Sequence, residues 1–130
     1  AAFAEIYADH SFLPAAQPGD IRCKLVSWYS MPEVAKLSRE LYGDREGHHA
    51  TPSEIAVTQY AFPAAIKSAQ LDELAPFTRF PSDAADFRRC FPDGRIQADS
   101  ALARPEHGAR FVDTCVAAVK QDYAAFVSAD

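Results

Sequence analysis

Two histidines and a glutamate surround one predicted helix start, and these residue types could do chemistry there. His48 and His49 come directly before Ala50, and Glu54 lies in the first turn of the helix that follows. An imidazole beside a carboxylate can serve a divalent metal ion or a hydrolytic water molecule. Thr51 and Glu54 also form the pattern of a capping box, which would explain the glutamate without any chemistry. The cap and the metal ligand both stay open as interpretations of Glu54.

Three helices are expected around and after this motif, each with a proline near its start. Proline suits the first helical position because its missing N–H has no helical partner there. Gly43 can end the first of these helices in a left-handed turn. The expected helices are 32–42 with a capping box of Ser30 and Glu33, 52–62 with Thr51 as the N-cap, and a long final helix from Pro105.

A β-strand is expected over residues 21–29, with Cys23, Leu25 and Ser27 on one face and Arg22, Lys24, Val26 and Trp28 on the other. Residues 1–8 show the apolar spacing of a helix, while prolines and aspartates over 66–100 favour irregular loops. This order of elements predicts an α/β layer fold in which helices cover a parallel sheet on both faces. One strand needs neighbours for its backbone groups, so we expect part of the fold to be missing from this chain.

Composition limits the class of protein. The 130 residues are 48% hydrophobic and 24% charged, which is enough for one globular core but does not suggest a second domain. The net charge of −5 and the absence of a Lys/Arg cluster argue against nucleic acid as a partner. The apolar runs are too short for a membrane span. Small molecules are the expected partners.

The three cysteines are scattered and have no metal-ligand spacing. Their odd number favours small buried hydrophobic residues in a reducing compartment, and therefore a cytoplasmic protein, although a disulfide between two of them stays possible.

Three blocks of sequence in the same order resemble the creatininase (creatinine amidohydrolase) family. They are Val26-Ser27-Trp28-Tyr29, then Gly47-His48-His49-Ala50-x-x-x-Glu54, and then the stretch from Phe91-Pro92-Asp93-Gly94 to Gly108. The resemblance covers nearly the whole chain. It implies a three-layer α/β/α sandwich with a mostly parallel sheet, and a divalent site, often with two metal ions, that activates water against a cyclic or linear amide. It also implies a homo-oligomer, commonly a hexamer.

The resemblance also implies metal ligands that this chain does not contain. The family takes its other ligands from an earlier Glu-x-His pair, a later aspartate, and a histidine in an Asn-Gly-His-Gly-Gly-Asn-like loop. We therefore expect residues 1–130 to be the C-terminal portion of a single creatininase-like domain, with the N-terminal portion of the same enzyme as its partner. Such a chain alone would hold an incomplete metal site and hydrolyse nothing.

The family motif His-Ala-x-x-x-Glu corresponds to His49, Ala50 and Glu54. The resemblance implies that Glu54 is a ligand of zinc, manganese or iron, with two ions in a complete site. It places His49 beside the metal-bound water, where a neutral imidazole could pass a proton to the leaving nitrogen. A loop histidine bonded to the backbone is the alternative for His49.

Two further residues are expected near the substrate. His48 is expected to point away from His49 and to lie beside the site. Trp28 lies at the end of the predicted strand, the edge at which α/β sheets bind ligands. Trp28 could equally be an ordinary core aromatic. Asp99 falls where the family usually has Gly-Asp-Pro, and a turn or packing role is expected for it.

The sequence thus predicts a metal-dependent amidohydrolase acting on a cyclic amide or a formamide-type C–N bond. Creatinine itself is not the expected substrate. The resemblance implies that creatininase binds creatinine in a pocket with two tryptophans, and this chain has a single tryptophan. The alternative is a non-catalytic subunit or interaction module that retains the fold.

Overall fold

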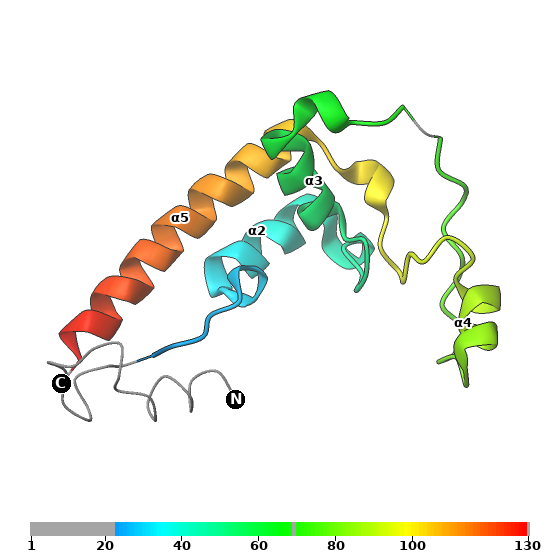
Figure 1. The fold of residues 1–130 in the computed structure, drawn as a ribbon, viewed down its shortest axis with the longest axis horizontal. Helices are drawn as coiled ribbons and strands as arrows, with labels where there is room; N and C mark the ends of the chain where they lie inside the picture. The colour runs from blue at the N-terminus through cyan, green and yellow to red at the C-terminus, as the bar shows by residue number, and fades with distance from the viewer. Residues whose placement is uncertain (1–22, 69, 130) are drawn as a thin grey trace, which may run out of the picture.

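The structure is a computed structural model that describes residues 23–68 and 70–129, and its regular elements are helices. Helices α2 and α3 pack against the first half of the long helix α5, while α4 lies in a separate lobe (Figure 1). The predicted helix over residues 1–8 lies outside the described residues. The helices are α2 (Pro32–Tyr42), α3 (Pro52–Ala61), α4 (Ala84–Cys90) and α5 (Pro105–Ser128), with 3-10 turns at Trp28–Ser30, Gly43–Arg45, Pro63–Ala65 and Ser100–Leu102.

The predicted three-layer α/β/α sandwich with a parallel sheet is wrong for the described part of the chain. These residues contain no sheet, and their β pairing is a single isolated antiparallel bridge between His49 and Ile96. The expected strand is absent too, because residues 23–27 form no ladder and Trp28–Ser30 is a 3-10 turn. A strand is stable only beside another strand, and the described residues supply no partner for this one.

Local signals predicted the helix starts and ends better than the strand. Proline is the first residue of α2, α3 and α5, as expected. Gly43 ends α2 with a positive φ of +56°, as expected, but its ψ of −133° lies outside the predicted left-handed helical conformation. The capping box expected from Ser30 is wrong, because Met31 is the N-cap of α2. The Ser30 hydroxyl instead donates to the carbonyl of Ser27 at 2.8 Å, within the preceding turn.

The hydrophobic core lies between α2 and α5. Phe111 is fully buried, with its ring stacked on Tyr42 at a centroid distance of 6.1 Å and edge-to-face with Trp28 at 6.5 Å. Val34 and Leu37 are one helical turn apart, so both point into the same core. The buried core residues are Met31, Val34, Leu37, Tyr42, Phe111 and Ala118.

Helices α3 and α5 approach each other backbone to backbone. A Cβ atom added to Gly108 would lie 2.0 Å from the carbonyl oxygen of Ala56, so only glycine fits at this crossing. Ala56 is itself fully buried. This close crossing holds α3 in place on α5. It therefore also sets the position of the first turn of α3, which carries the predicted site residue Glu54.

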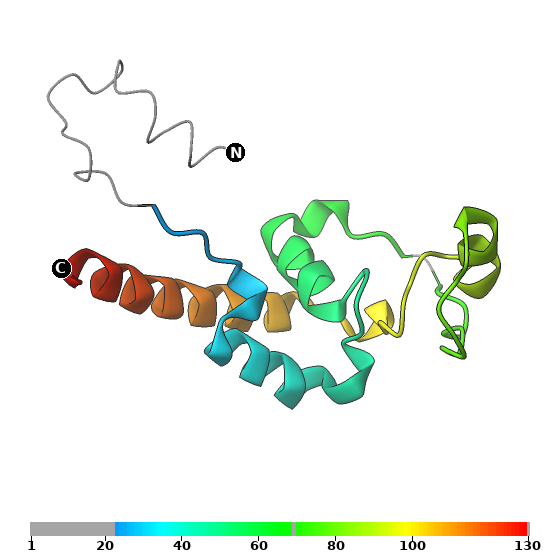
Figure 2. The same ribbon diagram turned by 90° about the horizontal axis from the view of Figure 1, so that it is seen from below.

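Residues 72–97 form a lobe around α4 that extends away from the other helices in both views (Figures 1 and 2). Phe77 and Phe91 stack at 6.1 Å, and the Arg95 guanidinium donates to the carbonyl of Asp72 at 2.7 Å, which closes the base of the lobe. Asp86 is buried and accepts hydrogen bonds from Arg79, which hold the pKa of its carboxyl well below the usual range. Helix α4 was not predicted, although Asp83 caps it through the backbone N–H of Asp86.

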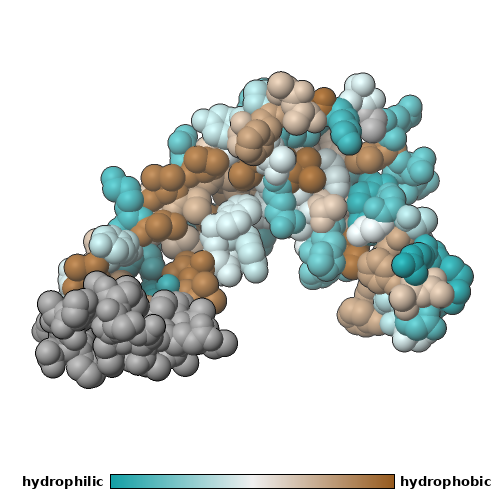
Figure 3. All heavy atoms as spheres, in the orientation of Figure 1, coloured by the Kyte–Doolittle hydropathy of each residue, from teal (hydrophilic) through white to brown (hydrophobic). Residues whose placement is uncertain are grey.

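Apolar side chains remain exposed along α5, where brown residues lie among teal and white ones in Figure 3. Val116, Val119, Tyr123 and Val127 are each more than two-fifths exposed. Among the described helices, none is both long enough and apolar enough to cross a membrane.

Candidate functional site

The loop that carries the two histidines is held against the C-terminal end of the α4 lobe and the residues that follow it. The His48 N–H donates to the carbonyl of Ile96 at 2.9 Å, and His49 pairs with Ile96 in the isolated bridge. Gly47 makes this approach possible. Its φ is +65°, and a Cβ atom there would lie 2.3 Å from the backbone nitrogen of Ala98.

Asp99 and Ser100 anchor the two ends of the same loop. The Asp99 N–H donates to the carbonyl of Arg45 at 2.8 Å, and its carboxylate forms an ion pair with the Arg45 guanidinium. The Ser100 hydroxyl donates to the carbonyl of Ala50. Asp99 also accepts the backbone N–H of Ala101, which confirms the turn role predicted for it.

Ala50 joins the histidine loop to α3 in a left-handed conformation, with a φ of +57°. A non-glycine residue rarely takes this conformation, because its Cβ approaches the following carbonyl oxygen. The resulting sharp turn sets the histidines immediately beside the first turn of α3.

The capping box at the start of α3 is confirmed. The Glu54 N–H donates to the Thr51 hydroxyl at 3.3 Å, and the Thr51 N–H donates to the Glu54 carboxylate at the same distance. The Thr51 hydroxyl also donates to that carboxylate at 2.9 Å. Glu54 is nevertheless exposed, so its second carboxylate oxygen can serve another group.

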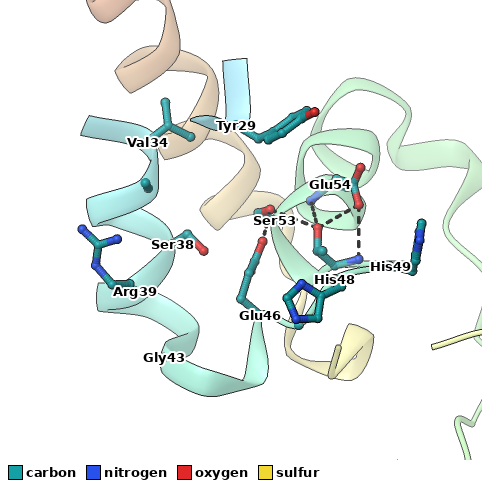
Figure 4. A pocket seen from close by; sticks show the side chains of 13 residues that line it. Tyr29, Val34, Ser38, Arg39, Gly43, Glu46, His48, His49, Ser53 and Glu54 are labelled. Atoms are coloured by element: carbon teal, nitrogen blue, oxygen red, sulfur yellow. Dashed lines mark hydrogen bonds between the residues drawn. The ribbon is translucent and has the colours of Figure 1, made fainter. Parts of the chain in front are cut away.

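The histidines, Glu54 and residues of α2 line one pocket of about 520 Å³. In Figure 4 the His48 ring lies toward Glu46, Glu54 lies in the first turn of α3 with Ser38 of α2 across from it, and the His49 ring lies on the other side of the loop. The structure therefore brings together three of the four predicted site residues. It does not bring in Trp28, which packs on the core, whereas its neighbour Tyr29 lines the pocket.

Glu46 is a pocket residue that the sequence did not reveal, because it lies in what was expected to be a connecting loop. One of its carboxylate oxygens, Oε1, accepts the Ser53 hydroxyl, and the other, Oε2, is buried and has no hydrogen-bond partner in the described residues. A buried carboxylate oxygen without a donor is unfavourable and rare in proteins. The one sequence feature that could have indicated a site role for Glu46 is its position two residues before His48.

Tyr42 is the last residue of α2 and contacts the first turn of α5. Its hydroxyl lies 2.9 Å from Nδ1 of His107, and the two rings meet edge-to-face. Burial, followed by the negative charge of Glu46, raises the pKa of Tyr42 to about 12. Tyr42 therefore stays a neutral hydrogen-bonding group at any physiological pH.

The described residues do not by themselves fit a metal centre. Nowhere in them do three or more His, Cys, Asp or Glu side chains come together as a metal ion requires. A protein site normally supplies at least three ligands. Glu54 supplies one oxygen donor, which is fewer than a metal ion needs.

Imidazole, carboxylate and hydroxyl groups around one pocket are typical of sites for hydrolysis or proton transfer. The comparison with protein families agrees with this class. The family described as creatininase (creatinine amidohydrolase) matches residues 1–122, and the chain belongs to that family. The predicted family is thus confirmed, and membership indicates amidohydrolase chemistry. No curated protein matches the chain.

Proposed function

We propose that this chain serves a metal-dependent amidohydrolase that cleaves a cyclic amide or a formamide-type C–N bond in a small molecule. The observation that supports the proposal best is the placement of His49 and Glu54 in the lining of one pocket, within the stretch that matches the creatininase family. His49 is exposed on its loop, so it can move a proton to a leaving amide nitrogen.

The other pocket residues would bind and orient the substrate. His48 lies beside His49 on the same loop, and Tyr29 rather than Trp28 supplies an aromatic wall to this pocket. We assign Glu54 as one oxygen ligand of zinc, manganese or iron, because hard divalent ions take carboxylate donors. The remaining ligands would come from polypeptide outside the described residues, in the N-terminal portion of the same enzyme.

The proposal extends to assembly and location. A homo-oligomer, as the family resemblance implies, would contain several copies of this pocket. Cys90 and Cys115 form no disulfide in the structure, which supports a cytoplasmic setting.

Replacing Glu54 by glutamine in the complete enzyme tests the assignment. Glutamine keeps an oxygen for the cap but loses the negative charge, so metal content measured by elemental analysis should fall while the helix remains folded. Glu33 is the matched control, since it is exposed in the first turn of α2 and does not line the pocket. Full metal occupancy in Glu54→Gln would leave Glu54 with its capping role alone.

A second function, a non-catalytic subunit or interaction module, is favoured by one observation. The described residues hold no cluster of three potential ligands. Under either function, titration of the folded 130-residue chain with Zn²⁺ or Mn²⁺ should reveal no tight stoichiometric site. Hydrolysis of cyclic amides, formamides or short peptides by the complete protein separates the two, because the module should cleave none of them.

A further inference from the structure

Two hydroxyl groups connect the two carboxylates of the pocket in a continuous chain of oxygen atoms (Figure 4). Glu46 contacts the Ser53 hydroxyl, Ser53 Oγ lies 3.2 Å from Thr51 Oγ1, and Thr51 Oγ1 lies 2.9 Å from a Glu54 carboxylate oxygen. Each hydroxyl has a single proton to donate, and an ionised carboxylate has none. The chain therefore has three contacts but only two protons to fill them.

The two protons can be arranged so that Glu54 is released. If Ser53 donates to Glu46, Ser53 Oγ is free to accept, and the Thr51 proton can turn either to Glu54 or to Ser53. If Glu46 accepts nothing, the Ser53 proton must turn to Thr51, and Thr51 must then donate to Glu54. Thr51 and Ser53 are both buried, at 8% and 4% exposed, so water is a poor substitute for either acceptor.

We propose that Glu46 is a positioning residue that allows Glu54 to leave its helix cap and serve the pocket. Glu46 takes the Ser53 proton, and Ser53 then becomes the alternative acceptor for Thr51 when Glu54 turns away. The N-cap hydrogen bond from the Glu54 N–H to the Thr51 hydroxyl survives this turn, whereas the Thr51 N–H gives up its carboxylate acceptor. This inference rests on the proposed function, in which the Glu54 carboxylate binds a ligand.

The action of Glu46 passes through Ser53. In the described residues, the Glu46 side chain makes its only hydrogen bond to that hydroxyl, and its other oxygen is buried without a partner. Glu46 makes no hydrogen bond or ion pair with Glu54 itself. A coupling between these two residues would therefore reveal the hydroxyl chain.

A double-mutant cycle on the unfolding equilibrium of the full chain tests the proposal. In Glu54→Ala, Thr51 can donate to Ser53, and in Glu46→Ala, Ser53 can donate to Thr51, so each single variant satisfies both protons. The double variant leaves one buried hydroxyl proton without an acceptor. Urea denaturation gives the unfolding equilibrium constant of each variant relative to the parent. For the double variant this ratio should exceed the product of the two single-variant ratios by about tenfold.

Glu46→Gln is the matched control, because its amide oxygen can still accept the Ser53 proton. The cycle repeated with glutamine at this position should show additive effects. If the alanine cycle is additive, or if glutamine couples to Glu54→Ala as strongly as alanine does, the proposal is wrong. In the latter case the charge of Glu46 would act instead of its hydrogen bond.

A variant of the bridge itself keeps the test decisive if the double variant fails to fold. Ser53→Ala removes the alternative acceptor, so in this background Glu46→Ala should lower stability by the same amount with Glu54 present and with Glu54→Ala. A coupling between Glu46 and Glu54 that persists without the Ser53 hydroxyl would overturn the proposal. The cycle measures unfolding and not hydrolysis, so an additive result leaves the proposed amidohydrolase function standing, and an absence of hydrolysis leaves the coupling intact.

Discussion

Replacing Gly47 by alanine should displace the histidine loop. A Cβ atom at this position would lie 2.3 Å from the Ala98 nitrogen and 2.4 Å from the Gln97 carbonyl carbon, and backbone atoms cannot swing aside as a flexible side chain can. The left-handed φ of Gly47 adds about 1–2 kcal/mol for any residue with a Cβ. Forced overpacking adds about 1–3 kcal/mol. We expect Gly47→Ala to lower the free energy of unfolding by about 2–5 kcal/mol.

Urea denaturation measures this loss, and Gly94→Ala provides the control. Gly94 also has a positive φ, at +82°, but no atom lies within 4 Å of its added Cβ. Its substitution should therefore lose the conformational part alone, about 1–2 kcal/mol. Equal losses in the two variants would refute the argument that the backbone contact between Gly47 and Ala98 sets the position of the loop.

Three further substitutions test the surroundings of the site. Gly108→Ala should lower the thermal midpoint by several degrees, because its Cβ would meet the carbonyl oxygen of Ala56 at 2.0 Å and force α3 from α5. Tyr42→Phe should abolish an ultraviolet titration near pH 12, and the parent should lose stability between pH 10 and 12, where the unfolded tyrosine releases its proton first. Asp86→Asn should expose the α4 lobe to proteolysis at neutral pH. Because folding lowers the pKa of Asp86, the parent lobe should itself lose stability as the pH falls below the ordinary value of 3.8.

Helix boundaries were predictable because the groups that set them are close in sequence. The capping box of Thr51 and Glu54 involves residues one turn apart, and the prolines at the helix starts act through their own φ angle. The same rule failed at Ser30, where the side chain has a competing acceptor in the carbonyl of Ser27. A local pattern therefore identified a helix start but not which residue would cap it.

The presence or absence of a sheet could not be predicted from local sequence patterns, because a strand depends on partner strands that are distant in sequence. Residues 21–29 alternate suitably, but the described residues offer nothing for that stretch to pair with. The family resemblance suggested a sheet, and residues 23–68 and 70–129 contain none. The family itself was predictable, since it depends on sequence blocks and not on pairing.

The candidate site was predictable in its local part alone. His49 and Glu54 share one motif, and the structure places both at the same pocket. Glu46 was missed because its burial depends on Ser53 and on the approach of the segment after the lobe, which no local pattern encodes. Trp28 could not be separated from an ordinary core aromatic, and it contacts Phe111 of α5.

The turnover of His49→Ala in the complete enzyme, compared with His48→Ala, tests the central claim most directly. Both histidines are exposed on the same loop and line the same pocket, so His48→Ala controls for loss of an imidazole at this place. We expect His49→Ala to lower kcat by about 10²–10⁴-fold with metal content near the parent value, and His48→Ala to do much less. Unchanged turnover in His49→Ala would contradict its proposed role in proton transfer, and parallel loss of metal would make it a ligand instead.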